Sequence, residues 1–384
     1  QAELMETIGV ITTNLGLYDE AEPLLEQSLE LRRTAAGAES LEVSSSLQNL
    51  AVLYDRQGRY REGEELARRS LAIREAELAP DSVEIAESLH ALGLLTQRQA
   101  KYDAAESAFV RAIAIREDAL GDDHPEVARS LRELGIVYQD QGRYDDAAAC
   151  YERALAIRER VLGADHPDVG ASLTSLASAR YLQGDLEEAR TLYQRALGIR
   201  EQTLGPDHPD VALALVSIAA IDYVEGRLED AEAALRRALA IQEQALGPDH
   251  PEVADSLARI ATLCQVQGRA DEADQLHRRA VGVLEDGGHA DSPQMVSALT
   301  QRASFLDDLG RYAEAEAEIR RAYDPRLTVI EGRVYMCFAL DTKHGLRGGI
   351  AVTDDFEKFE VLHLTVPDDR NMVLFPEKIG GKFL

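Results

Sequence analysis

A glycine recurs at a fixed interval of 42 residues along most of this chain. Each copy closes a segment with helical apolar periodicity, and Ala100 fills the one remaining slot. The glycine positions are Gly16, Gly58, Gly142, Gly184, Gly226, Gly268 and Gly310. A period of this length indicates stacked units that each cover an apolar face of the next unit. We therefore expect a solenoid and not a globule with one central core.

The unit from Ala119 to Arg160 shows how each repeat is built. A first helix carries an apolar stripe, and Gly142 then ends that helix as a C′ glycine. The first stripe consists of Leu131, Leu134, Gly135 and Tyr138. A second helix carries a similar stripe at Ala147, Tyr151, Ala154, Leu155 and Ile157. Small residues at Gly135, Ala147 and Ala154 predict a close approach of the two helices.

The spacing Leu134-Gly135-x2-Tyr138, followed by Ala147-x3-Tyr151, resembles the tetratricopeptide repeat. The longer second helix and the GxDHP loop after it resemble the repeats of the kinesin light chain and its bacterial relatives. The resemblance covers residues 1–322 in eight units, of which the first lacks its front and the last is cut within its second helix. It implies a mostly α fold, a right-handed α-solenoid of eight helix hairpins.

Composition excludes several functions. The formal net charge of −28 argues against nucleic acid and anionic membrane surfaces as partners. No run reaches the roughly 18 apolar residues of a membrane span, and no export signal opens the chain. Cys150, Cys264 and Cys337 are too few and too far apart for a disulfide framework or a zinc site. We expect a cytoplasmic protein with no metal and no cofactor.

A histidine also recurs every 42 residues, at His124, His166, His208 and His250. A metal ladder is one interpretation, but successive repeats place these residues on neighbouring loops that do not converge. Ser82 and Ser292 take the same slot, and Pro follows each histidine, as at an ordinary helix start. We expect these histidines to act in helix starts and not as ligands.

In tetratricopeptide arrays the first helices line a concave groove that receives a partner segment. By this resemblance, repeats five to seven offer a groove floor of small, tyrosine and uncharged residues. Its members are Thr174, Ser178, Tyr181, Leu182, Val216, Ala220, Tyr223, Val224, Thr262 and Val266. We expect a scaffold that binds an extended or helical apolar protein segment there. The alternative is that some of these residues pack against neighbouring helices.

The partner itself is not indicated. The kinesin light chain clamps peptide backbone with a ladder of asparagines, and among the matching positions of this chain only Asn49 is an asparagine.

After Ala322 the helical period stops, and short β-prone runs between glycine turns begin. Lysine occurs once in residues 1–322, as Lys101, and four times in residues 323–384. We therefore place a domain boundary here. The expected strands are 327–330, 334–340, 349–352, 361–366 and 372–375.

The motifs YDPRLTVIEGRVYM and NMVLFPEKIGGKF in this terminal part resemble the inverting β-mannoside phosphorylases of glycoside hydrolase family 130, with the mannosylglucose phosphorylases nearest. The resemblance implies an all-β fragment, residues 323–384, of a five-bladed β-propeller. It implies that Asp324 is the general acid, that Tyr323 binds the mannoside, and that Arg370 binds inorganic phosphate, the co-substrate. The products would be mannose 1-phosphate and glucose. An Asp before a Pro is also an ordinary turn.

A single acid without a closed site cannot position phosphate and sugar together, so we expect no phosphorylase activity from these 384 residues. The leading interpretation is an interaction scaffold with an inactive enzyme fragment. The alternatives are a phosphorylase of which this chain shows a part, and two unrelated pieces joined near Tyr323.

Overall fold

The computed structural model describes residues 1–322, without the side chain of residue 320, and the backbone of six strands between residues 326 and 383. Contacts divide the chain into an N-terminal unit, Gln1–Ile221, and a C-terminal unit, Asp222–Leu384. Each unit is described by itself.

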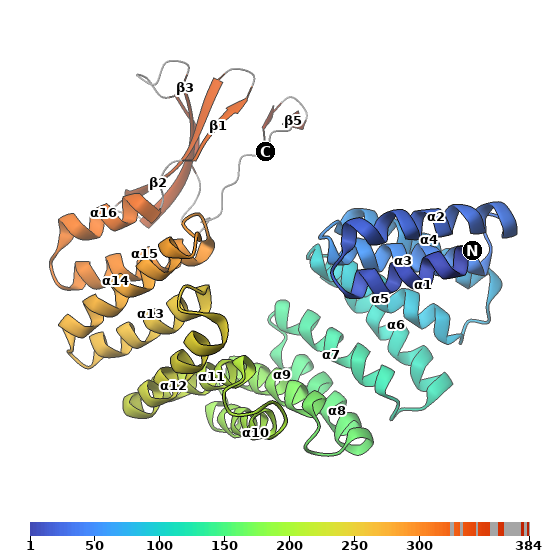
Figure 1. Cartoon of the computed structure of the whole chain (residues 1–384), viewed down its shortest axis with the longest axis horizontal. Helices are drawn as coiled ribbons and strands as arrows, with labels where there is room; N and C mark the ends of the chain where they lie inside the picture. The colour runs from blue at the N-terminus through green and yellow to red at the C-terminus, as the bar shows by residue number, and fades with distance from the viewer. Residues whose placement is uncertain are drawn as a thin grey trace. The chain divides into compact units, whose positions relative to one another are not determined.

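Sixteen helices run through residues 1–322 as eight consecutive hairpins (Figure 1). The first helices of the hairpins are α1 (Ala2–Asn14), α3 (Leu41–Arg56), α5 (Val83–Arg98), α7 (Pro125–Asp140), α9 (Pro167–Gln183), α11 (Pro209–Val224), α13 (Pro251–Val266) and α15 (Pro293–Asp308). The second helices are α2 (Tyr18–Ala36), α4 (Tyr60–Glu77), α6 (Tyr102–Leu120), α8 (Tyr144–Leu162), α10 (Leu186–Leu204), α12 (Leu228–Leu246), α14 (Ala270–Asp286) and α16 (Tyr312–Ala322). The eight predicted repeats are confirmed. Among these described helices, none is both long and apolar enough to cross a bilayer.

The recurring glycine forms the turn inside each hairpin. Gly142 has a φ of 75°, and its N–H donates to the carbonyl of Gln139 at 3.0 Å. The N–H of Arg143 donates to the carbonyl of Tyr138 at 2.8 Å. These two bonds are a Schellman motif, which satisfies the last carbonyls of the first helix and reverses the chain. The predicted role of Gly142 is confirmed.

Glycine residues in the first helices allow the two helices of a hairpin to approach each other closely. A Cβ at Gly135 in α7 would lie 2.5 Å from Cε1 of Tyr151 in α8. A Cβ at Gly93 would lie 2.7 Å from Phe109. The rings of Tyr151 and Phe109, which are 2 % and 0 % exposed, therefore pack directly on the opposing helix backbone.

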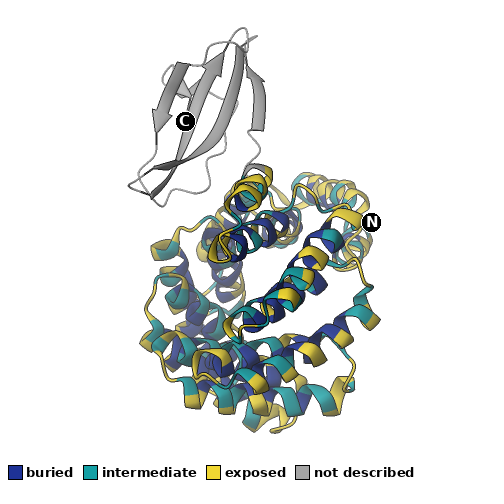
Figure 2. Cartoon of the chain, turned by 90° about the vertical axis from the view of Figure 1, so that its left-hand side faces the viewer, coloured by how far each residue is buried: buried dark blue, intermediate teal, exposed yellow. Residues whose placement is uncertain are grey.

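Neighbouring hairpins share their cores. One cluster joins Leu71 of α4, Leu89 of α5 and Ala112 of α6, so it belongs to two repeats at once. Figure 2 shows the buried residues as stripes on the facing sides of the helices, with exposed residues on their outer sides. Neighbouring hairpins of the N-terminal unit thus cover apolar faces of each other, as the period predicts.

After Ala322, four strands form an antiparallel sheet in sequential order. They are β1 (Arg326–Ile330), β2 (Arg333–Thr342), β3 (Gly345–Thr353) and β4 (Glu360–Leu364). In their register Arg326 lies opposite Cys337, and Val334 opposite Thr353. A separate two-stranded pair consists of β5 (Lys378–Ile379) and β6 (Lys382–Phe383).

Part of the terminal prediction falls outside the described residues. The expected strand 372–375 lies there, and so do Tyr323, Asp324 and Arg370. The β-propeller and its catalytic residues therefore stay predictions.

Candidate partner-binding surface

An arginine lies at the same position near the end of the second helix in five consecutive repeats. We call Arg32, Arg74, Arg116, Arg158 and Arg200 the arginine ladder. Each guanidinium lies at the seam between its own hairpin and the first helix of the next repeat. Arg116 is the most enclosed of them, with 0 % of its surface exposed.

The ladder arginines bond to the start of the next first helix. Arg116 Nη1 donates to Ser130 Oγ at 2.5 Å and to the carbonyl of Glu126 at 3.0 Å. Arg200 Nη1 donates to the carbonyl of Asp210 at 3.2 Å. Burial lowers the pKa of Arg116 to about 10, so this guanidinium keeps its charge at neutral pH. The ladder ties successive hairpins together with charge-assisted hydrogen bonds.

The ladder changes in the last two seams. Gln242 replaces the arginine in repeat six, and its Oε1 accepts a hydrogen bond from Ser256 Oγ at 2.6 Å. Leu284 replaces it in repeat seven, and Ala298 stands where Arg116 finds Ser130. At this last seam an apolar residue therefore stands in place of both the arginine and the serine.

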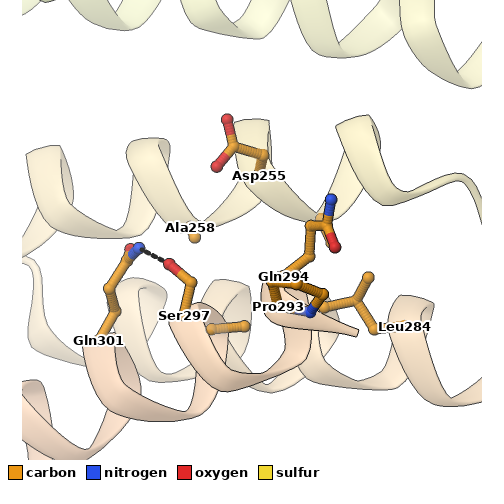
Figure 3. A pocket seen from close by; sticks show the side chains of 9 residues that line it. Asp255, Ala258, Leu284, Pro293, Gln294, Ser297 and Gln301 are labelled. Atoms are coloured by element: carbon orange, nitrogen blue, oxygen red, sulfur yellow. Dashed lines mark hydrogen bonds between the residues drawn. The ribbon is translucent and has the colours of Figure 1, made fainter. Parts of the chain in front are cut away.

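A pocket of about 220 Å³ opens at the Leu284 seam, between α13, α14 and α15. Its lining residues are Ala254, Asp255, Ala258, Leu284, Pro293, Gln294, Ser297, Ala298 and Gln301. Asp255 and Ala258 come from α13, while Gln294, Ser297 and Gln301 rise from α15 on the opposite side (Figure 3). The pocket thus combines an apolar floor with polar groups on both sides.

Two polar contacts shape the rim of this pocket. Gln301 Nε2 donates to Ser297 Oγ at 3.0 Å, drawn as the dashed line in Figure 3. Asp255 Oδ2 accepts from Arg259 Nε at 2.9 Å, one helical turn further along α13. Sequence reasoning missed the pocket. The signal was present in the sequence, because a column of arginines with a 42-residue period ends in Gln242 and then in the apolar Leu284.

The predicted groove residues of the N-terminal unit are mostly half-buried. Thr174 Oγ1 accepts from ladder residue Arg200 at 3.0 Å, and Ser178 hydrogen-bonds the buried Tyr193 side chain. These two residues therefore contact neighbouring helices, and their place in the groove stays a prediction. Tyr181, Val216 and Ala220 are also half-buried. Leu182 is 40 % exposed.

In the C-terminal unit the predicted groove residues are more open. Tyr223 is 41 % exposed, Val224 55 % and Val266 54 %. Thr262 is half-buried and donates to the carbonyl of Ala258 at 3.1 Å. The structure therefore leaves Tyr223, Val224 and Val266 accessible at the ends of α11 and α13.

Comparison with known families decides what these hairpins are. A family model described as tetratricopeptide repeat matches residues 1–76, 56–118, 84–160, 127–202, 171–224 and 210–286. A second model with the same description matches residues 296–324. The chain belongs to the tetratricopeptide repeat family.

Solved structures show the same fold. BtubC from P. vanneervenii is 23 % identical, with a TM-score of 0.52 over 58 % of this chain and 90 % of that chain. The quorum sensor NprR from B. thuringiensis, in its apo form, is 15 % identical, with a TM-score of 0.59 over 84 % of this chain and 87 % of that chain. The signal-transduction ATPase PH0952 from Pyrococcus horikoshii, which has a tetratricopeptide repeat sensor, is 13 % identical, with a TM-score of 0.61 over 84 % of this chain and 47 % of that chain.

Comparison with curated proteins gives no match. The resemblance of residues 323–384 to mannoside phosphorylases has no support among the comparisons, and it stays a prediction.

One position sets three of the tetratricopeptide repeats apart. Leu182, Val224 and Val266 occupy the same repeat position at the end of α9, α11 and α13, and we call them the aliphatic column. The other repeats carry polar or charged residues there, namely Asn14, Arg56, Arg98, Asp140 and Asp308. The uncharged character predicted for repeats five to seven is thus concentrated at an exposed position.

The recurring histidines are N-caps of the first helices. His124 Nδ1 accepts from the N–H of Glu126 at 3.2 Å, and His208 Nδ1 accepts from the N–H of Asp210 at 3.1 Å. His166 and His250 make the same bond. Ser292 caps α15 through its hydroxyl. The cap interpretation is confirmed, because one ring nitrogen of each histidine is already in use.

The atoms of Glu232, Cys264 and Glu272 that could ligate a metal lie within 4.8 Å of one another. Both carboxylates are already paired, since Arg236 bonds to Glu232 at 2.7 Å and to Glu272 at 2.6 Å. Arg269 also pairs with both. The same pairing of a second-helix carboxylate with a cation of the next hairpin turn recurs along the chain. Its other copies are Glu22–Arg59, Glu64–Lys101, Glu106–Arg143 and Asp274–Arg311. The cluster is therefore part of a repeated ion-pair system.

Proposed function

We propose that this chain is a protein-interaction scaffold that binds an apolar segment of a partner protein at the ends of the first helices α11 and α13, within the C-terminal unit. The observation that supports it is the exposure of Tyr223, Val224 and Val266 in the C-terminal unit, where the two valines take a position that is charged or polar in the repeats outside the aliphatic column. Exposed apolar side chains that lie together on a protein surface mark interaction sites.

The size of the surface sets the expected affinity. Full burial of a Val or Leu side chain contributes about 1.5–3 kcal/mol, and these residues are already about half buried. Each would then add about 1 kcal/mol when a partner covers it. A few such contacts, less the cost of ordering the partner, favour a transient complex over a permanent one.

The charge of the scaffold restricts the partner. A net charge of −28 repels acidic segments, and it attracts neutral or basic ones. We propose a partner segment with aliphatic or aromatic anchors and no excess of carboxylates.

The test uses peptides selected from a random display library on the full chain. We expect the selected peptides to share apolar anchors and to lose at least about tenfold in affinity with Val266→Asp or Val224→Asp, because a buried carboxylate without a partner is costly. Tyr223→Ala should weaken the same peptides. Titration calorimetry measures each affinity.

Val110→Asp is the matched control, since Val110 is 47 % exposed but lies on a second helix, α6. It should leave affinity unchanged. Selected peptides that respond equally to Val110→Asp and Val266→Asp would contradict the proposal.

A further inference from the structure

We propose that the pocket at the Leu284 seam binds an arginine side chain of the partner. The inference rests on the proposed function in one respect, namely that the arginine belongs to a bound segment. It adds a defined specificity pocket, at a seam of the C-terminal unit that the aliphatic column does not include.

The first argument is the internal comparison of seams. At the seam of Arg116, the guanidinium occupies the space between the second helix and the start of the next first helix. Leu284 stands at the position of Arg116, and the shorter side chain leaves that space open as the pocket. The same local frame therefore accommodates a guanidinium elsewhere in this chain.

The second argument is that the missing serine does not prevent guanidinium binding. Arg200 faces Ala214 at the position where Arg116 faces Ser130. Arg200 nevertheless donates to the carbonyl of Asp210 at 3.2 Å and to Thr174 at 3.0 Å. Ala298 at the Leu284 seam is thus compatible with an arginine, and Gln294 supplies the backbone carbonyl at the position of Asp210.

The third argument is the chemistry of the lining. Ala258, Leu284 and Ala298 offer apolar contact to the methylene groups of an arginine stem. The rim carries the Asp255 carboxylate and the side-chain oxygens of Gln294 and Gln301, which can accept from a guanidinium (Figure 3). Arg259 bonds to only one oxygen of Asp255 in this arrangement. A carboxylate has about four acceptor sites, so it can receive a second guanidinium.

Size and charge favour this occupant over others. A volume of about 220 Å³ is smaller than the roughly 300–1,000 Å³ of small-molecule sites, and it suits one side chain. The net charge of −28 attracts a cation from solution. Arginine also carries five donors in a planar fork, which matches acceptors on two sides of the pocket better than the point charge of lysine does.

The experiment titrates N-acetyl-L-arginine methylamide into the full chain and follows methyl NMR signals of alanine and leucine residues. We expect the Ala258, Leu284 and Ala298 methyl signals to shift in a saturable manner. The matching norleucine and citrulline derivatives should leave them in place, because both lack the charge. No shift with the arginine probe, or equal shifts with norleucine or citrulline, overturns the proposal.

Variants of the pocket complete the test. Leu284→Arg fills the slot from within the chain and should abolish the Ala258 and Ala298 shifts. Leu284→Met, which adds no guanidinium, should retain them. Asp255→Asn should weaken the probe by about two- to fivefold, as expected for a partly exposed ion pair. Probe binding that survives Leu284→Arg overturns the assignment.

Failure of this inference is distinguishable from failure of the proposed function. Val266→Asp lies outside the pocket lining and should weaken selected apolar peptides while leaving the arginine probe unaffected. If the peptides respond to Val266→Asp but the arginine probe never binds, the scaffold function stands and the arginine pocket is wrong.

Discussion

The backbone of one hairpin turn is strained at a single residue, Ala100. Ala100 occupies the turn position at which every other repeat has glycine, and its φ is 55°. The corresponding glycines have φ values from 73° at Gly310 to 86° at Gly184. A side chain in the left-handed region costs roughly 1–2 kcal/mol because its Cβ crowds the following carbonyl. The turn between α5 and α6, in the third hairpin, is therefore strained.

We expect Ala100→Gly to raise the free energy of unfolding by about 0.5–1 kcal/mol, since relief of strain outweighs the extra freedom of glycine in the unfolded chain. Urea denaturation measures the change. The control is Ala114→Gly, an exposed position within α6, which should lower stability by about 1 kcal/mol. A decrease with Ala100→Gly similar to that control would contradict the prediction.

His277 is a buried titratable residue. It is 1 % exposed, its ring lies 5.3 Å from that of Phe305, and neither ring nitrogen has a hydrogen-bond partner within the described residues. Burial lowers its pKa from 6.5 to about 4. Between these pH values the unfolded chain binds the proton and the folded chain does not, so stability falls as pH decreases.

We expect His277→Leu to flatten this dependence between pH 6.5 and pH 4, by up to about 3 kcal/mol across the window. Leucine is the residue at the same position of the preceding repeat, as Leu235. Urea unfolding at several pH values gives the slope. Part of it should persist, because burial also lowers the pKa of His90, to about 2. An unchanged slope in the variant would refute the assignment.

At the scale of elements, the hairpins were predictable and the seams were not. Gly142 and the stripes around it specify where each helix ends and which face is buried, because those signals are local in sequence. Arg116 and Leu284 act between repeats, so their meaning depends on which first helix they face. The periodic column of arginines shows which residues meet at a seam only when the stacking of the hairpins is already known. For the same reason the hydrogen bond between Thr174 and the ladder residue Arg200 could not be predicted from the sequence.

We expect Gly135→Ala to lower the free energy of unfolding by about 1–3 kcal/mol, because the new Cβ would lie 2.5 Å from the Tyr151 ring. Tyr151→Leu leaves room for that methyl group. In a double-mutant cycle the two changes should therefore cost less together than the sum of the single costs. Additive costs would show that the contact between these two residues is not the cause.

At the scale of the whole molecule, we expect specificity for a partner to come from the positions at which single repeats differ from the others. The hairpin turn, the histidine caps and the carboxylate–cation pairs recur, so they explain the fold and not the partner. The aliphatic column and Leu284 are the exceptions, and both proposed binding features come from them. Residues 323–384 follow a different pattern, and the sequence supplies only a resemblance there.

For that terminal part we expect no phosphorolysis by the purified chain, since one acid and one phosphate ligand do not position both substrates. The assay incubates the chain with mannosylglucose, with and without inorganic phosphate, and measures mannose 1-phosphate. Asp324→Asn serves as the control for contaminating activity. Phosphate-dependent product that disappears in Asp324→Asn would show that the chain is an enzyme.

The arginine ladder also restricts which repeats can follow one another. Half of each joint belongs to one repeat and half to its successor, as Arg116 and Ser130 illustrate. A copy of repeat three inserted after repeat two would find a matching partner on both sides. Repeat seven moved into the middle of the chain would place Leu284 before a serine made to receive a guanidinium, and one transposition would spoil two joints. Repeats that carry both the arginine and the serine are therefore exchangeable at this joint, whereas repeat seven is compatible only with a successor that offers no serine to a guanidinium.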